Sequence, residues 1–294
     1  MALVLITGTS RGIGYETALA FARAGNNVLA TMRNPISSPQ LAEVATKEHL
    51  PIEIFSMDVD SDASVTEGFK AIHEKYGPAD VLVNNAGIER AGSIEELPLS
   101  EFRAVMETNY FGALRCIQAV LPHMRQRRSG CIINVSSVAG RISSSPLTPY
   151  MATKWALEAL SEGLAGEMKM FNVRVAVVEP GITDTEMAHR LEVAPGSSPY
   201  PQHVRIAAIF EASLLKNPVP PADIAKKILE VADSGTWQLR HPVGGADGFL
   251  QWRKSFSDEE WVALYSSDDE TWYARIERDF GLDTRPDLPK RVAS

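Results

Sequence analysis

The chain has 294 residues and a formal net charge of −8, with 37 acidic residues against 29 Lys and Arg residues. This acidic balance argues against a nucleic-acid-binding surface. No segment approaches the ~20 apolar residues that a membrane-spanning helix needs, and the first residues, MALVLITG, lack the basic leader of a signal peptide. We therefore expect a soluble, cytoplasmic protein without a metal site, in which Cys116 and Cys131 are buried, reduced thiols.

Strand and helix patterns alternate from the first residues to about residue 240. Helical periodicity predicts helices at 13–24, 39–48, 62–76, 100–127 and 150–170. Short apolar runs predict strands at 3–7, 28–31, 52–57, 80–83, 131–135 and 173–178. Near-continuous apolar strands that alternate with helices form parallel sheets covered on both faces. The pattern therefore indicates an α/β fold, a doubly wound parallel sheet of Rossmann type.

The regular alternation ends after Gly181. Residues 186–221 are rich in proline around one helical stretch at 202–216. A long irregular insertion of this kind is typical of a lid or binding loop, so we expect 186–221 to be a lid. A helix at 222–232 and a last strand at 236–240 are predicted to follow.

The tail at 244–294 contains three of the five tryptophans. Two capping-box patterns, at 257–260 and 267–270, predict two short helices in it. The tail is too short for a core of its own, so we expect one domain at 1–243 with the tail as a helical, aromatic-rich extension of that domain.

A glycine-rich turn, TGTSRGIG at residues 7–14, follows the first predicted strand and leads into a helix. Gly8, Gly12 and Gly14 carry no side chain that would block the close approach of a pyrophosphate, and the helix N-terminus offers free amides. Such a turn can be an ordinary one, but its place between a strand and a helix is the context of a dinucleotide site.

The end of the second predicted strand indicates which dinucleotide binds. A cofactor without a 2′-phosphate is usually held there by a carboxylate, whereas this chain has Thr31, Met32 and Arg33. Arg11, inside the glycine-rich turn, can reach the same place. Because guanidinium groups bind phosphate oxygens, we expect NADP(H) in preference to NAD(H). An Arg33 side chain that points only to water is the alternative.

Tyr150 and Lys154 are four residues apart, so they lie on one face of the predicted helix. A nearby ammonium lowers the pKa of a phenol, which would make Tyr150 a proton donor and acceptor near neutral pH. Ser137, at the end of the preceding strand, can hydrogen-bond the same substrate oxygen. By strand alternation the neighbouring Ser136 points to the other side. A solvated helix face is the alternative for the Tyr150–Lys154 pair taken alone.

These motifs together resemble the short-chain dehydrogenase/reductase family over roughly residues 1–240. The family implies a seven-stranded Rossmann sheet and hydride exchange between a nicotinamide and an alcohol or carbonyl. The segments VEPG, ATMR and RHPVG resemble more loosely the hydroxysteroid and retinol dehydrogenases. The matching motifs are the glycine-rich turn, Asp58-Val59, Asn84-Asn85-Ala86-Gly87, Asn109, Ser137, Tyr150, Lys154 and Pro180-Gly181.

The resemblance also implies how a cofactor is held. Asp58 would bind the adenine amino group, and Asn84 and Ala86 would line the adenosine side. Thr185 would contact the carboxamide, and Thr183 stands where the family has Val or Ile, a change we expect to matter little. The cofactor-binding residues expected in all are Gly8, Ser10, Arg11, Gly12, Ile13, Gly14, Arg33, Asp58, Val59, Asn85, Ala86, Gly87, Tyr150, Lys154, Pro180, Gly181, Thr183 and Thr185.

For the reaction, the resemblance implies that Tyr150 supplies the proton in the reductive direction. Lys154 would lower the pKa of Tyr150 and hold the nicotinamide ribose, and Ser137 would polarise the carbonyl. Asn109 would help hold a water that returns the proton through Lys154; a packing role for Asn109 is the alternative.

A mostly apolar wall is expected around the substrate, which predicts a small hydrophobic ketone, aldehyde or alcohol. The helices at 100–127 and 150–170 have broad apolar faces, and by resemblance they would form a homodimer or homotetramer. The expected substrate-binding residues are Ser137, Ile142, Leu147, Tyr150, Met187 and Leu191, with Ile88 beside them.

Two other classes of function remain open at this stage. The chain could sense NADPH without chemistry, although Ser137, Tyr150 and Lys154 are all present. It could also be an isomerase or dehydratase that retains its nicotinamide, although such enzymes usually have a larger substrate domain.

Overall fold

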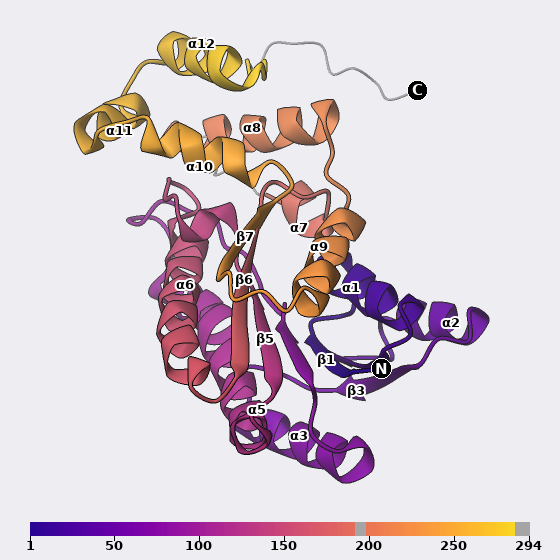
Figure 1. Cartoon of the computed structure of the whole chain (residues 1–294). Coiled ribbons are helices and arrows are strands. Elements are labelled where there is room, and N and C mark those ends of the chain that lie inside the picture. The colour runs from indigo at the N-terminus through magenta and orange to yellow at the C-terminus, as the bar shows by residue number, and fades with distance from the viewer. Residues whose placement is uncertain (192–197, 286–294) are drawn as a thin grey trace.

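A seven-stranded, all-parallel sheet forms the centre of the protein in a computed structural model that describes residues 1–191 and 198–285 (Figure 1). The strand order is β3-β2-β1-β4-β5-β6-β7, which confirms the doubly wound sheet predicted from the sequence. The order reverses between β1 and β4, which are hydrogen-bonded neighbours. The strands are β1 Leu3–Thr7, β2 Asn27–Met32, β3 Ile52–Ser56, β4 Val81–Asn84, β5 Gly130–Val135, β6 Val173–Pro180 and β7 Arg240–Val243.

Helices cover both faces of the sheet (Figure 1). One face packs on α1 (Gly12–Arg23), α2 (Gln40–Lys47) and α9 (Pro221–Asp233). The other packs on α3 (Asp62–Tyr76), α5 (Ala113–Arg127) and α6 (Thr148–Lys169). Strand alternation divides the two cores, because Val4 and Ile6 join the first and Leu5 joins the second. Cys116 and Cys131 are buried free thiols, as expected.

The helix predicted at 100–127 is interrupted. The structure has α4 (Leu99–Met106), a π-helix η1 (Glu107–Gly112) and then α5. The wider turn brings Gly112 against Val59, where an added Cβ would lie 2.8 Å from a methyl carbon. A π-helical turn inside an α-helix is often found at a functional site.

Two predictions near the C-terminus are wrong. The last strand is β7, Arg240–Val243, and not 236–240, because it pairs in register with Val177–Pro180 of β6. It is an edge strand, which is where a sheet tolerates a proline such as Pro242. The second capping box is also absent, since Asp268 and not Ser267 caps the last helix by accepting from the Thr271 amide.

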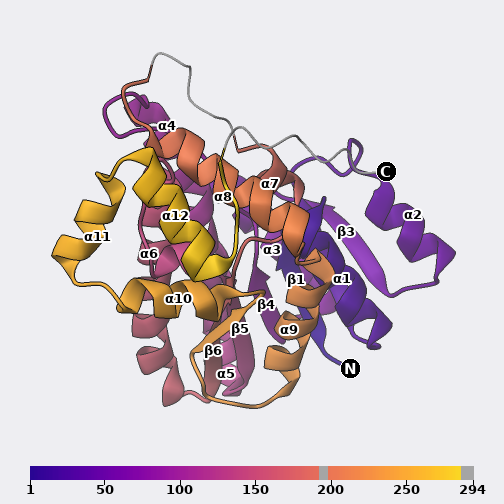
Figure 2. The ribbon, with the colours of Figure 1, turned by 90° about the horizontal axis from the view of Figure 1, so that it is seen from above.

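The lid and the extension lie together at one end of the sheet (Figures 1 and 2). Residues 192–197 of the expected lid and 286–294 of the expected extension lie outside the described residues. Up to residue 285, the extension has one helix more than the two predicted, and the first capping box, at Ser257 and Glu260, is confirmed. The helices are α7 (Glu186–His189) and α8 (Gln202–Lys216) in the lid, and α10 (Ala246–Lys254), α11 (Asp258–Tyr265) and α12 (Asp269–Phe280) in the extension.

A third apolar core joins these helices to the segment that follows β5. Trp272 and Ile276 of α12 are 1% and 0% exposed, and they share this core with Ile142, Leu147 and Met151. In the described part of the chain, no helix combines the length and apolar character of a membrane span.

The third core predicts a stability effect. Ile276→Ala should lower the free energy of unfolding by about 2–5 kcal/mol, because it leaves a cavity in a fully buried position. Urea denaturation measures this change. Val262→Ala, at a position that is 68% exposed on α11, is the control and should change stability by less than about 0.5 kcal/mol. Equal small effects of both variants would show that the extension is not packed as described.

Candidate active site

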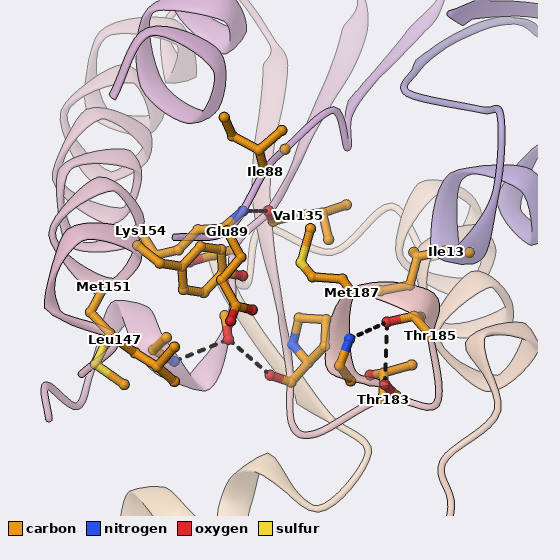
Figure 3. A pocket seen from close by; sticks show the side chains of 18 of the residues that line it. Ile13, Ile88, Glu89, Val135, Leu147, Met151, Lys154, Thr183, Thr185 and Met187 are labelled. Atoms are coloured by element: carbon orange, nitrogen blue, oxygen red, sulfur yellow. Dashed lines mark hydrogen bonds between the residues drawn. The ribbon is translucent and has the colours of Figure 1, made fainter. Parts of the chain in front are cut away.

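One cavity of about 360 Å³ lies at the carboxyl ends of the strands (Figure 3). Its size is that of a small-molecule site, and ligands of open α/β sheets bind at this edge, where the strand order reverses. The glycine-rich turn and the ends of β4, β5 and β6 line one part, and the lid and the extension line the other.

The turn between β1 and α1 leaves an anion site open. The helix N-terminus has no side-chain cap and no acidic residue in its first turn, so its amides are available. Gly8 has φ +71°, and an added Cβ would lie 2.7 Å from Ala86 Cα. The Asn85 side chain donates to the Thr7 and Gly8 carbonyls, both at 3.0 Å, and fixes the turn. These features fit the pyrophosphate of a dinucleotide.

The two arginines predicted to bind a 2′-phosphate differ in their surroundings. Arg33 is exposed at the end of β2, lines the cavity, and its guanidinium makes no hydrogen bond or ion pair with residues 1–191 or 198–285. Arg11 also lines the cavity but pairs with Glu186 of the lid at 2.7 Å. Of the two, Arg33 is therefore the guanidinium available to an anion.

The three predicted reacting side chains come from α6 and from the segment after β5, and they line the same cavity as the glycine-rich turn. Tyr150 and Lys154 lie in the first two turns of α6, and Ser137 follows β5. The Ser137 hydroxyl accepts from the Ala139 amide at 3.1 Å and contacts the Tyr150 phenol. The Lys154 ammonium donates to the Val135 carbonyl at 2.9 Å and lies 5.5 Å from the centre of the Tyr150 ring. All three side chains line the cavity.

The pKa of Tyr150 is raised in this structure, whereas the sequence predicts that Lys154 lowers it. Burial raises the pKa of Tyr150, the negative charge of Glu89 raises it further, and the hydrogen bond from Ser137 only partly offsets this. Burial also lowers the pKa of Lys154 to about 8. Because the ammonium is directed at a main-chain carbonyl, desolvation dominates the pKa of the phenol, and the predicted lowering of that pKa by Lys154 stays a prediction.

Asn109, in the π-helix, does not line the cavity. Its side-chain oxygen accepts from the Ile88 amide at 2.8 Å, and its nitrogen donates to the Ile88 carbonyl and to Thr153 Oγ1, at 2.9 and 3.0 Å. It thus ties the loop after β4 to α6, the helix of Tyr150. Its predicted part in a proton relay stays a prediction.

Three other expectations differ from the structure. Asn84 is buried away from the cavity and donates to Asn134 at 2.8 Å. Gly14 packs against the Gly8 carbonyl behind the turn, and Leu191 packs against the third core. The remaining predicted residues line the cavity with Ser137, Tyr150 and Lys154; they are Gly8, Ser10, Arg11, Gly12, Ile13, Arg33, Asp58, Val59, Asn85, Ala86, Gly87, Ile142, Leu147, Pro180, Gly181, Thr183, Thr185 and Met187.

The sequence reasoning missed two parts of the site. One is Glu89: the neighbouring Arg90 pairs with Glu101, and the Glu89 side chain extends into the cavity (Figure 3). The aromatic wall was expected only in outline, from the tryptophans of the tail. Its residues in the extension are Phe249, Trp252, Trp261, Tyr265 and Trp272.

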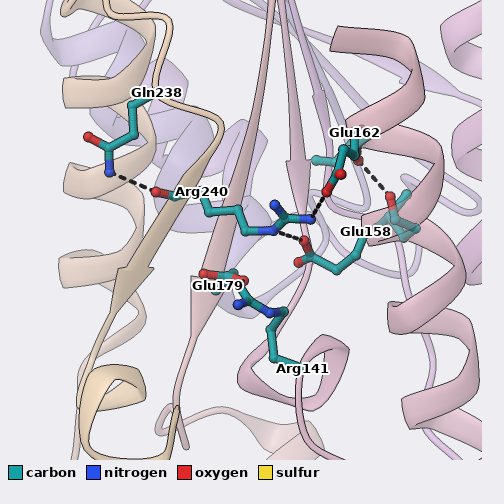
Figure 4. Close-up of polar contacts among 9 residues, drawn as sticks. Arg141, Glu158, Glu162, Glu179, Gln238 and Arg240 are labelled. Carbon is teal, nitrogen blue, oxygen red and sulfur yellow. Dashed lines mark hydrogen bonds and ion pairs between the residues drawn. The ribbon is translucent and has the colours of Figure 1, made fainter. Parts of the chain in front are cut away.

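Buried glutamates of α6 and β6 form ion pairs with arginines of β7 and of the segment after β5 (Figure 4). Glu158, one turn after Lys154, binds Arg240 of β7 at 2.9 Å, and Arg240 also binds Glu162 at 2.6 Å. Glu179 of β6 binds Arg141, just after Ser137 in the chain, at 3.1 Å. Because Glu158 and Glu179 are buried, removal of either arginine would leave a buried charge without its partner.

Comparisons with known proteins agree with this site. A family model described as short chain dehydrogenase matches residues 2–195. The uncharacterized oxidoreductase YusZ of Bacillus subtilis is 33% identical over 271 residues, which are 89% of this chain and 96% of that protein. Human retinol dehydrogenase 8 is 39% identical over 251 residues, which are 81% of this chain and 79% of that protein.

A solved short-chain dehydrogenase from Streptomyces avermitilis has a TM-score of 0.76 and 32% identity to this chain. The match covers 94% of this chain and 98% of that one. The family model and these relatives together show that the chain is an oxidoreductase of the short-chain dehydrogenase family.

Proposed function

We propose that the protein is an NADP(H)-dependent oxidoreductase that interconverts a hydrophobic ketone or aldehyde and its alcohol. The observation that carries this proposal is the meeting of Ser137, Tyr150 and Lys154 in one cavity, between an open anion site and an apolar wall. Hydride transfer to a carbonyl needs this combination of a cofactor site, a proton donor and a water-poor chamber.

The chemistry follows from the groups that line the cavity. When bound, a nicotinamide supplies the hydride to the carbonyl carbon. Tyr150 Oη gives its proton to the carbonyl oxygen, and Ser137 donates a hydrogen bond that polarises the same oxygen. With a pKa of about 8, Lys154 is mostly protonated at pH 7, so its charge favours the phenolate that this step leaves.

The preference for NADP(H) rests on charge at the end of β2. Arg33 faces the cavity without a partner in the described chain, and the following residues Asn34 and Pro35 add no carboxylate. A 2′-phosphate would be held by the guanidinium, whereas the ribose hydroxyls of NAD(H) would find no carboxylate acceptor there.

The substrate class is inferred from the apolar side chains that line the cavity. Ile142, Leu147, Met187 and the aromatic residues of the extension are apolar, and human retinol dehydrogenase 8 is named for an apolar alcohol. We propose that the lid and the extension together enclose such a substrate.

A homodimer through α5 and α6 is part of the proposal. Val105, Ile117 and Val120 are buried within the chain, but Phe111 and Trp155 are 42% and 49% exposed. Phe111 belongs to η1, which leads into α5, and Trp155 belongs to α6. Large apolar side chains that are exposed on a monomer are typical of subunit contacts.

The proposal is tested with purified protein, NADPH and a panel of apolar ketones and aldehydes. Net loss of NADPH absorbance with formation of the alcohol supports a reductase. NADPH binding without consumption would indicate a sensor, and substrate conversion without net consumption an isomerase; either result would overturn the proposal.

Tyr150→Phe should lower kcat by at least about 10²–10⁴-fold, because it removes the proton donor. NADPH binding, measured by cofactor fluorescence, should persist. The control is Tyr273→Phe, which removes the hydroxyl of another buried tyrosine outside the cavity and should keep most of the turnover. Retention of most activity by Tyr150→Phe would refute the assignment.

Arg33→Ala should weaken NADPH binding about 10- to 100-fold and leave NADH binding nearly unchanged, because a charged hydrogen-bonding partner of the 2′-phosphate is lost. Fluorescence titration with each cofactor measures the ratio. Arg103→Ala, an exposed arginine of α4 outside the cavity, is the control. Equal loss for both cofactors, or no loss, would contradict the preference for NADP(H).

A further inference from the structure

Glu89 places a carboxyl group in the cavity, near the hydroxyls of Ser137 and Tyr150 and beside apolar side chains. It follows Ile88 in the loop after β4, and its side chain extends into the chamber (Figure 3). Ile142, Leu147 and Met187 line the same chamber. None of these neighbours can donate a hydrogen bond from its side chain.

This carboxyl group has no partner within residues 1–191 and 198–285. Arg90 donates to the Glu89 main-chain carbonyl at 2.8 Å, but its guanidinium pairs with Glu101. Burial raises the pKa of Glu89 to about 7. An unpaired carboxyl group in a low-polarity chamber costs folding free energy, and no structural contact of the side chain offsets that cost.

Glu89 also lies close to the reacting groups. Its negative charge raises the pKa of Tyr150, and both side chains line the chamber that Ser137 faces. A substrate whose carbonyl oxygen lies between the Ser137 and Tyr150 hydroxyls therefore presents its neighbouring atoms to Glu89.

We propose that Glu89 is a specificity-determining residue that selects hydrophobic carbonyl substrates bearing a hydroxyl group near the carbonyl. This inference rests on the proposed function and narrows its substrate class. Glu89 accepts a hydrogen bond from the substrate hydroxyl, which gives the Glu89 carboxyl group the partner that it lacks within the described residues. A neutral hydroxyl fits better than an ammonium, because the Lys154 ammonium in the same cavity repels a second cation.

The test compares three forms of one cyclic ketone: a hydroxyl next to the carbonyl, its methyl ether, and an amine at the same place. The ether keeps an acceptor but loses the donor. At about pH 8, above the Glu89 pKa of about 7, the carboxyl group is mostly ionised. The wild-type protein should then favour the hydroxyketone over the ether by about 10- to 100-fold in kcat/KM, mainly through KM, since a hydrogen bond to a charged group has this strength. The amine should be a poorer substrate than the hydroxyketone.

Glu89→Leu should bring the hydroxyl-to-ether ratio close to 1, and Glu89→Gln, which keeps an acceptor oxygen, should give an intermediate ratio. Glu67→Gln, on an exposed part of α3 outside the cavity, is the matched control and should keep the wild-type ratio. A Glu89→Leu ratio equal to that of the wild type would overturn the inference. A wild-type preference for the amine would overturn the choice of a hydroxyl.

A binding measurement separates this inference from the proposed function. Trp252, Trp261 and Trp272 line the cavity, so quenching of tryptophan fluorescence reports ligand binding without turnover. If no carbonyl consumes NADPH, the reductase proposal fails. The hydroxyl-to-ether ratio of dissociation constants, in the wild type and in Glu89→Leu, then still decides whether Glu89 selects hydroxylated ligands.

Discussion

The site depends on one buried hydrogen bond, from the Lys154 ammonium to the main-chain carbonyl of Val135 at 2.9 Å. Val135 is the last residue of β5, two residues before Ser137, and Lys154 is one helical turn after Tyr150. The bond therefore joins the strand that ends near one hydroxyl to the helix that carries the other. Lys154 is only 5% exposed, and burial of its ammonium lowers the pKa of that group to about 8.

The surroundings of this hydrogen bond differ on its two sides. Ion pairs and close packing lie on one side, and apolar side chains lie on the other. On one side, the Glu158–Arg240 pair joins α6 to β7, and the Glu179–Arg141 pair joins β6 to the segment after β5 (Figure 4). Gly140 allows the close packing there, since an added Cβ would lie 2.7 Å from Ser136 Oγ and 2.9 Å from Glu158 Cγ. In front, the helices of the extension close the chamber with aromatic side chains. In the proposed reaction, proton transfer would thus be confined to a few polar atoms among mostly apolar side chains.

Much of the fold and the cofactor end could be predicted because their signals are local. Apolar strands, the glycine-rich turn and the Tyr150–Lys154 spacing are each readable within a few residues. The remaining features depend on contacts between distant segments. The π-helix follows from contacts of Asn109 with Ile88 and Thr153, and the pairing of Arg11 follows from the position of Glu186 in the lid. The direction of the Glu89 side chain depends on the partner of Arg90. Hydrophobic periodicity cannot predict that this partner is Glu101.

The most direct test of the central claim is a crystal structure of the protein with NADP⁺ and an unreacted apolar ketone, a combination that cannot transfer hydride. The account predicts that the ketone oxygen lies within hydrogen-bonding distance, about 2.6–3.2 Å, of both the Tyr150 and the Ser137 hydroxyls, with Lys154 beside the phenol. A ketone oxygen that contacts neither hydroxyl, or a Tyr150 hydroxyl shielded from the nicotinamide, would contradict it.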